Sequence, residues 1–109
     1  CSMFDPLGTI TYNSGNNELT IPITLIPCAR EYEYSTRYND GGWTGWSSLT
    51  SVSATQTTLG KIVENVNVLW PSVYDDDTVP KQIKVRAKCT NANPTQYSPW
   101  QQANPNYTY

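Results

Sequence analysis

Hydrophobic and polar residues alternate along much of this chain, which is the pattern of a β-strand with one buried face. The clearest case is residues 30–38, where aromatic or threonine side chains lie on one face and charged or serine side chains on the other: Tyr32, Tyr34, Thr36 and Tyr38 against Glu31, Glu33, Ser35 and Arg37. A helix would scatter these two sets around its circumference. The segment therefore predicts a strand whose tyrosine face is buried.

The same alternation predicts further strands at residues 19–25, 43–49, 62–70, 81–89 and 97–102. In the first of them, Pro22 has no N–H to donate and so predicts a sheet edge or a bulge. In the third, one face is shared by Ile62, Glu64, Val66, Val68 and Trp70, and Pro71 ends the strand. In the fourth, the aliphatic side chains are expected inside and the basic ones outside: Ile83, Val85 and Ala87 against Lys84, Arg86 and Lys88.

Turn signals separate these strands. Residues 39–42, with the sequence Asn-Asp-Gly-Gly, predict a tight turn because Asn and Gly adopt positive φ at low cost. A polar Ser/Thr stretch at 50–58 and a loop at 72–80 divide the rest, and no helix of any length is expected. The chain therefore predicts one all-β domain over residues 1–109. Its expected fold is a Greek-key β-sandwich of about seven antiparallel strands, with residues 1–8 and 103–109 as extended tails.

Several of these segments resemble the fibronectin type III family. Residues 32–49, which run Tyr-Glu-Tyr-Ser-Thr-Arg-Tyr, Asn-Asp-Gly-Gly-Trp and then Thr-Gly-Trp-Ser-Ser-Leu, look like the hairpin of its strands C and C′. Residues 83–89 resemble strand F, and Tyr97-Ser-Pro-Trp100 is similar to the start of strand G. The likeness covers about residues 18–102. It implies a fibronectin type III or immunoglobulin-like sandwich.

The resemblance also implies a disulfide bond. Strands C and F are antiparallel neighbours in such domains, so the start of C, near Cys28, lies close to the end of F, at Cys89. A bridge between these two residues would add up to ~4 kcal/mol of stability on chain-entropy grounds. The alternative is a pair of separate buried thiols, because free Cys packs well as a small hydrophobe.

Composition narrows the range of functions. The net charge is −2, and seven Lys and Arg cannot supply the phosphate-neutralising surface that nucleic acid requires. No apolar run approaches the ~20 residues of a membrane-spanning helix. The absence of histidine excludes Ser-His-Asp and Cys-His catalysis. General acid–base catalysis by Glu31, Glu33 or Glu64 would need a cleft, and a sandwich of this size has little volume for one. A non-catalytic protein without a cofactor is expected.

Three tryptophans, Trp43, Trp46 and Trp100, are candidate interaction residues with two interpretations. As an exposed row, their rings could stack against sugars. In cytokine-receptor sandwiches, which are related to the family named above, such rings alternate with strand-F Arg and Lys in a cation–π ladder. We favour the ladder, for which the resemblance offers three cations: Lys84, Arg86 and Lys88.

Weaker candidates lie elsewhere. Asp75, Asp76 and Asp77 form either a Ca²⁺ site or a solvated loop. Cys1 has three interpretations. It could be the acylated N-terminus of a lipoprotein, with Ser2 in a suitable next position, or a thiol that forms an intermolecular disulfide. It could also have no role and mark only the point where this stretch of sequence starts. Asn106 opens an N-glycosylation sequon. The same tail carries Tyr107 and Tyr109, and it could join the edge of a neighbour's sheet.

The polar, weakly charged, tyrosine-rich composition is typical of extracellular or cell-surface proteins. A structural or adhesion module is expected, which meets a protein partner or other copies of itself, as a surface-protein domain or as a subunit of a filament or phage appendage. The alternative is a carbohydrate-binding accessory domain that uses exposed Trp and Tyr. A lipid at Cys1 is the one membrane attachment that the sequence suggests.

Overall fold

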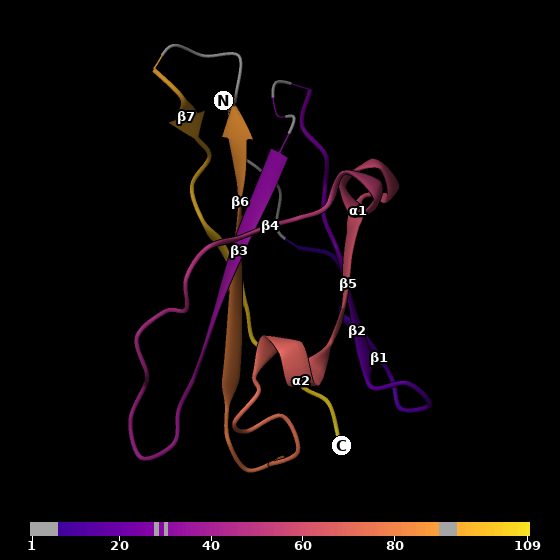
Figure 1. The fold of residues 1–109 in the computed structure, drawn as a ribbon, viewed down its shortest axis with the longest axis vertical. Helices are drawn as coiled ribbons and strands as arrows, with labels where there is room; N and C mark the ends of the chain where they lie inside the picture. Colours follow the sequence, from indigo (N-terminus) through magenta and orange to yellow (C-terminus); the bar gives the residue numbers. More distant parts are fainter. Residues whose placement is uncertain (1–6, 28, 30, 90–93) are drawn as a thin grey trace.

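Two antiparallel sheets, packed together, make up most of the molecule (Figure 1). The computed structural model describes residues 7–27, 29, 31–89 and 94–109. One sheet has the order β1 (Thr11–Asn13), β2 (Glu18–Pro22), β5 (Lys61–Asn65). The other has the order β4 (Thr50–Ser51), β3 (Glu31–Tyr38), β6 (Lys81–Cys89), β7 (Gln96–Tyr97), and β8 (Gln101–Ala103) also pairs with β6. The expectation of a mainly β protein with two packed sheets is confirmed.

The core lies between the sheets and follows the alternation read from the sequence. Tyr32 and Tyr34 of β3 are both buried on the inner face, and they lie opposite Ala87 and Val85 of β6. Along β6 every odd-numbered residue is buried and every even-numbered residue is partly exposed. The second sheet and its connections close the core with Leu19, Ile21, Ile23, Ile62 and Trp70. The strand expected at 19–25 is shorter than its pattern, because β2 ends at Pro22 and Leu25 is exposed.

The strand expected at 62–70 is also too long. β5 ends at Asn65, whose side chain accepts a hydrogen bond from the backbone N–H of Asn67 at 3.2 Å and so caps α2 (Val66–Leu69). This turn of helix leaves Val68 59% exposed and brings Trp70 into the core. There the Trp70 indole N–H donates to the carbonyl of Arg37 on the opposite sheet, at 3.1 Å.

A second short helix, α1 (Ala54–Leu59), lies in the Ser/Thr stretch where no helix was expected. Ser53 caps its start by accepting from the N–H of Gln56, and Gly60 ends it in the left-handed conformation at φ 70°. The Gln56 amide pairs with the backbone of Val63 in β5, donating to its carbonyl at 3.0 Å and accepting from its N–H at 3.3 Å. A side chain thus occupies the outer edge of β5 as a neighbouring strand would.

Two other predicted strands are broken. Residues 43–49 follow β3 through isolated backbone bonds, from Thr44 N–H to Tyr38 and from Ser47 N–H to Thr36, and only the two residues of β4 form a ladder with it. The strand at 97–102 divides into β7 and β8 around Ser98, whose hydroxyl accepts the N–H of Ala87 at 2.8 Å. Both pieces pair with β6, so the position of the last strand was correct and its continuity was not.

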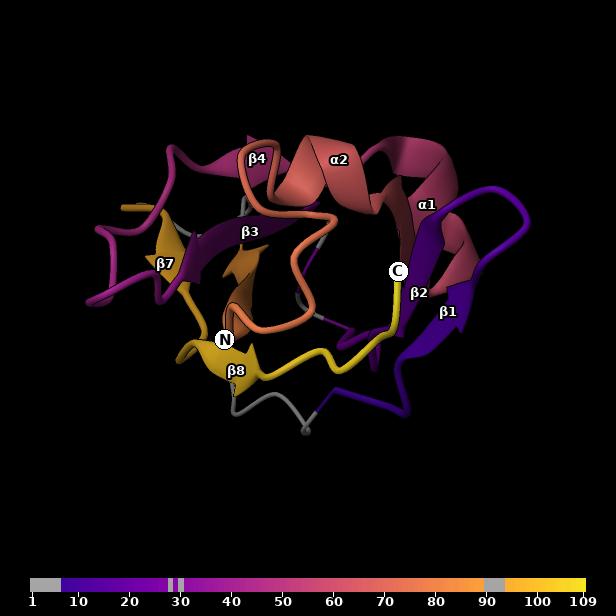
Figure 2. The ribbon, with the colours of Figure 1, turned by 90° about the horizontal axis from the view of Figure 1, so that it is seen from below.

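The C-terminal tail packs against its own domain. From β8 it crosses towards the three-stranded sheet (Figure 2). There the Tyr107 ring stacks on Tyr12 of β1 at a centroid distance of 4.8 Å, and its hydroxyl donates to the carbonyl of Tyr74 at 2.8 Å. The Tyr109 N–H donates to the Asp77 carboxylate at 2.9 Å. The expected interaction residues Tyr107 and Tyr109 are therefore engaged within the chain, and the tail does not lie free for a neighbour's sheet.

Candidate functional site

The outward face of the five-stranded sheet carries a row of matched cross-strand pairs. In the register of β3 and β6, Glu31 lies opposite Lys88 and Glu33 opposite Arg86. The second pair forms an ion pair of 2.9 Å, and the first is looser at 3.5 Å. Opposite charges placed directly across an antiparallel ladder stabilise its register.

Aromatic rings fill the spaces between these cations. The order along the face is Trp43, Arg37, Trp46, Lys84, Trp100, Arg86, Tyr97. Each cation lies over two rings, at centroid distances between 3.8 Å for Arg86 over Tyr97 and 4.6 Å for Arg86 over Trp100. We call these seven side chains the ladder. It joins β3 and β6 to the loop after β3 and to the segment between β7 and β8.

The ladder agrees with the arrangement favoured from the sequence, with one exchange of residues. Lys84 and Arg86 contribute as expected, but Lys88 pairs with Glu31 instead. Arg37, which the sequence reasoning overlooked, supplies the third cation. Its position could have been found, because it lies on the same outward row of β3 as Glu31 and Glu33. Its Nε also donates to Gln82 Oε1 at 2.7 Å, which fixes the guanidinium.

Lys84 is the central cation of the ladder. Its Nζ lies 4.3 Å from the centroid of Trp46 and 4.4 Å from that of Trp100. Burial, together with the neighbouring charges of Arg37 and Arg86, lowers the pKa of the Lys84 ammonium. The two indole faces act in the opposite direction, since their quadrupoles favour a cation.

The two ends of the ladder are its most exposed rings. Trp43 and Tyr97 are each 42% exposed, whereas Trp46 and Trp100 are partly buried. Each end ring meets one cation, and each inner ring meets two. At each end of the ladder, the last aromatic ring therefore has a ladder cation over only one of its two faces.

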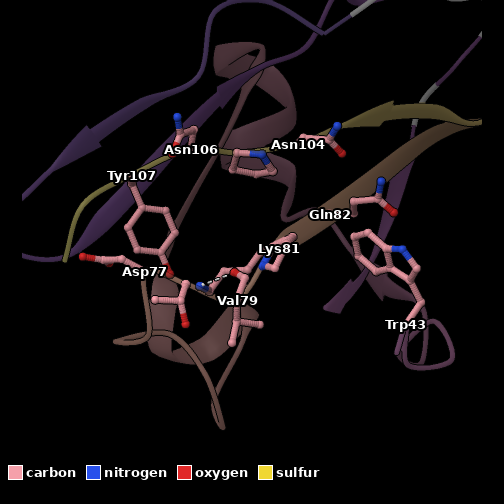
Figure 3. Close-up of a pocket in the computed structure, with 11 residues that line it drawn as sticks. Trp43, Asp77, Val79, Lys81, Gln82, Asn104, Asn106 and Tyr107 are labelled. Atoms are coloured by element: carbon pink, nitrogen blue, oxygen red, sulfur yellow. Dashed lines mark hydrogen bonds between the residues drawn. The ribbon is translucent and has the colours of Figure 1, made fainter. Parts of the chain in front are cut away.

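Trp43 also lines a pocket of about 340 Å³ (Figure 3). The pocket is bounded by the loop before β6, by the start of β6 and by the tail, so it brings together segments far apart in the sequence. Lys81 lies within its wall, 6% exposed, and its ammonium donates to the carbonyls of Asp76 at 2.8 Å and Val79 at 3.0 Å. Burial lowers the pKa of Lys81, although the nearby carboxylates oppose that shift.

The acidic loop makes turns among its own residues. The Asp76 carboxylate accepts from the N–H and the hydroxyl of Thr78, and these hydrogen bonds lower the pKa of Asp76. Asp77 accepts from the tail, as described above. Among the described residues, no three His, Cys, Asp or Glu side chains converge to hold a metal ion. The structure thus offers no geometry in support of the calcium hypothesis at Asp75, Asp76 and Asp77.

Several other sequence predictions remain as they were. Cys1 and Cys28 lie outside the described residues, so the lipid and the disulfide with Cys89 stay predictions; Cys89 itself is buried at the end of β6. Asn106 is exposed, which is compatible with glycosylation. In the described part of the chain, no helix is both long and apolar enough to cross a bilayer.

Comparisons of the chain with family models, with curated proteins and with solved structures find no match.

Proposed function

We propose that the chain is a non-catalytic, fibronectin type III-like module of an extracellular or cell-surface structure, and that it acts through protein–protein contacts. The strand order supports this proposal: a three-stranded sheet of β1, β2 and β5 is compatible with strands A, B and E of such domains. In the same proposal, the other sheet supplies C′, C, F and G, and G is interrupted at Ser98. The outward ladder supports the relationship too, because related receptor sandwiches carry one.

The observation that carries the function is the ladder surface. Trp, Tyr and Arg are the residues that dominate the binding energy of protein interfaces. Here they form one face whose side chains are ordered before any partner arrives, through ring contacts and through ion pairs such as Arg86 with Glu33. Side chains ordered in advance lose less conformational entropy on binding.

The same contacts disfavour the alternative function, in which sugars stack on an exposed row of tryptophan rings. A sugar stacks on a free ring face. The rings of Trp46 and Trp100 each have two cations within 4.6 Å of their centroids. Their faces are engaged within the chain, so sugar binding by this inner pair would require the ladder to open.

Site-specific photo-crosslinking in the native assembly tests the proposal. A photoreactive phenylalanine analogue replaces Tyr97 at the exposed end of the ladder, and in a matched variant it replaces Leu59, which is 62% exposed on α1. We expect crosslinks to a neighbouring copy or another protein from position 97 and few from position 59. Crosslinks from position 59 alone, or none from position 97, would contradict the assignment of the ladder as the contact surface.

A further inference from the structure

The pocket at the Trp43 end of the ladder has the chemistry of a small-molecule binding site. Its volume of about 340 Å³ lies within the ~300–1,000 Å³ range of small-molecule pockets. In Figure 3, Trp43 and Tyr107 lie on opposite sides of the pocket, Gln82 lies beside Trp43, and Asn104 lies along the edge between the two rings. Such pockets combine apolar and aromatic walls with a few polar groups that orient the ligand.

Trp43 supplies an open aromatic wall. Among the residues that the structure describes, Arg37 is the one cation over its ring, at 4.6 Å, because Trp43 is the last ring at this end of the ladder. The side chain remains 42% exposed and borders the pocket. An apolar face of a ligand can therefore stack on Trp43 in the pocket, while the contact with Arg37 holds the indole in place.

The tail supplies the polar groups. Pro105 is buried and Tyr107 packs inward, so the alternation of an extended chain turns Asn104 and Asn106 outward at the pocket rim. Gln82 accepts from Arg37 through its carbonyl oxygen, which leaves its amide N–H groups available to a ligand. Side-chain amides both donate and accept hydrogen bonds, so they match hydroxyl groups, which do the same.

The charges in the wall disfavour an ionic ligand of either sign. The ammonium of Lys81 and the carboxylate of Asp77 lie in the same wall and offset each other, so neither sign of ligand charge gains a net attraction. Lys81 is already bound to two carbonyls, and its Nζ lies 5.4 Å from the centroid of the Tyr107 ring. The favoured ligand is neutral, has one apolar face and carries several hydroxyls.

From this combination we infer that the pocket binds a neutral saccharide, with one sugar ring stacked on Trp43 and its hydroxyls bound by Gln82 and Asn104. The inference goes beyond the proposed protein contacts, because it concerns a small-molecule pocket that shares only Trp43 with the ladder. It also differs from a tryptophan platform, since it needs one ring and the tail.

NMR titration with neutral methyl glycosides and short neutral oligosaccharides tests this inference, because the four Trp indole N–H groups report separately. The chain is produced without N-glycosylation, so that Asn106 is unmodified. We expect the Trp43 indole signal to move with added sugar. Trp43→Ala should weaken binding by at least ~10-fold, and Asn104→Ala, at an exposed position outside the ladder, by about 2- to 12-fold.

Tyr97→Ala is the matched control, because it removes the other end of the ladder, which has the same exposed fraction. This variant should bind sugar within about twofold of the parent chain. The inference fails if no neutral saccharide moves the Trp43 signal up to ~50 mM, well above a millimolar Kd. It also fails if Trp43→Ala and Asn104→Ala bind as the parent does, or if peptides or charged sugars move this signal and neutral sugars do not. None of these results bears on crosslinking from position 97.

Discussion

Lys84 lies at the centre of the ladder, and we predict that Lys84→Met lowers the free energy of unfolding by about 1 kcal/mol. The lysine ammonium is sandwiched between Trp46 and Trp100, at 4.3 and 4.4 Å from the ring centroids. Methionine keeps much of the apolar stem that packs between the rings and removes the charge. The substitution therefore isolates the cation–π contribution from the burial of the methylene groups.

The magnitude follows from two opposing effects. A cation–π contact at an exposed site contributes about 0.5–1 kcal/mol, so two of them contribute about 1–2 kcal/mol. Against this, burial and the like charges of Arg37 and Arg86 disfavour the ammonium, as the lowered pKa of Lys84 indicates. Solvent screens these repulsions at the surface, so they reduce the gain without cancelling it. A net loss of about 1 kcal/mol corresponds to a fall in Tm of about 4 °C for a domain of this size.

Urea unfolding followed by tryptophan fluorescence measures the effect, and Lys88→Met provides the control. Lys88 lies on the same strand and the same face, but its partner Glu31 has a side chain that is 51% exposed. Such an ion pair contributes less than about 0.5 kcal/mol. If Lys84→Met is as stable as the parent chain, or loses no more than Lys88→Met, the ladder does not stabilise the sheet as argued.

Two further predictions concern the edge of β5 and the tail. Gln56→Ala removes both hydrogen bonds to Val63, so we expect the free energy of unfolding to fall by about 1 kcal/mol. The uncovered edge of β5 should also cause concentration-dependent aggregation, measured by light scattering, and a soluble, fully stable variant would contradict this role. Burial raises the pKa of Tyr107, so the folded state keeps this proton when the unfolded chain has lost it, and stability should fall as the pH rises above about 10. Tyr107→Phe should reduce the loss of stability at alkaline pH, measured by urea unfolding at a series of pH values, and the lost hydrogen bond to Tyr74 should cost about 1 kcal/mol at neutral pH. An unchanged pH dependence would argue against a buried Tyr107 hydroxyl.

The strands that pair along their whole length were predictable from the sequence, and the others only in part. β3 and β6 pair over eight residues from Glu31 to Tyr38, and burial on one side keeps the alternation in phase. The alternation at 62–70 looks the same in the sequence, yet Val66 begins a helix because Asn65 caps it. Alternation with a period of two does not reveal a helix cap. Because residues 66–69 are helical, Val68 does not lie on the buried face that the alternation predicts, and its side chain is 59% exposed.

The ladder could be anticipated and the pocket could not. The resemblance to receptor sandwiches implied cation–π contacts between tryptophans and the outward Lys and Arg of one strand, and outward positions of neighbouring strands do share a face. The pocket joins Trp43 to Gln82 and to Asn104, residues from three separate segments. Its existence depends on how the tail folds back, which follows from the packing of Tyr107 and not from any local pattern.

The difference between inner and terminal rings of the ladder assigns separate roles to chemically similar tryptophans. Trp46 and Trp100 each interact with two cations, which fixes them as structural elements of a surface that a protein partner can meet without rearrangement. Trp43 interacts with one cation and borders a cavity. Because the ladder alternates three cations with four rings, the ring at each end contacts one ladder cation and not two. The tail adds polar side chains beside the ring of Trp43, which is why we infer ligand binding at that end of the ladder and propose protein contact at the end formed by Tyr97.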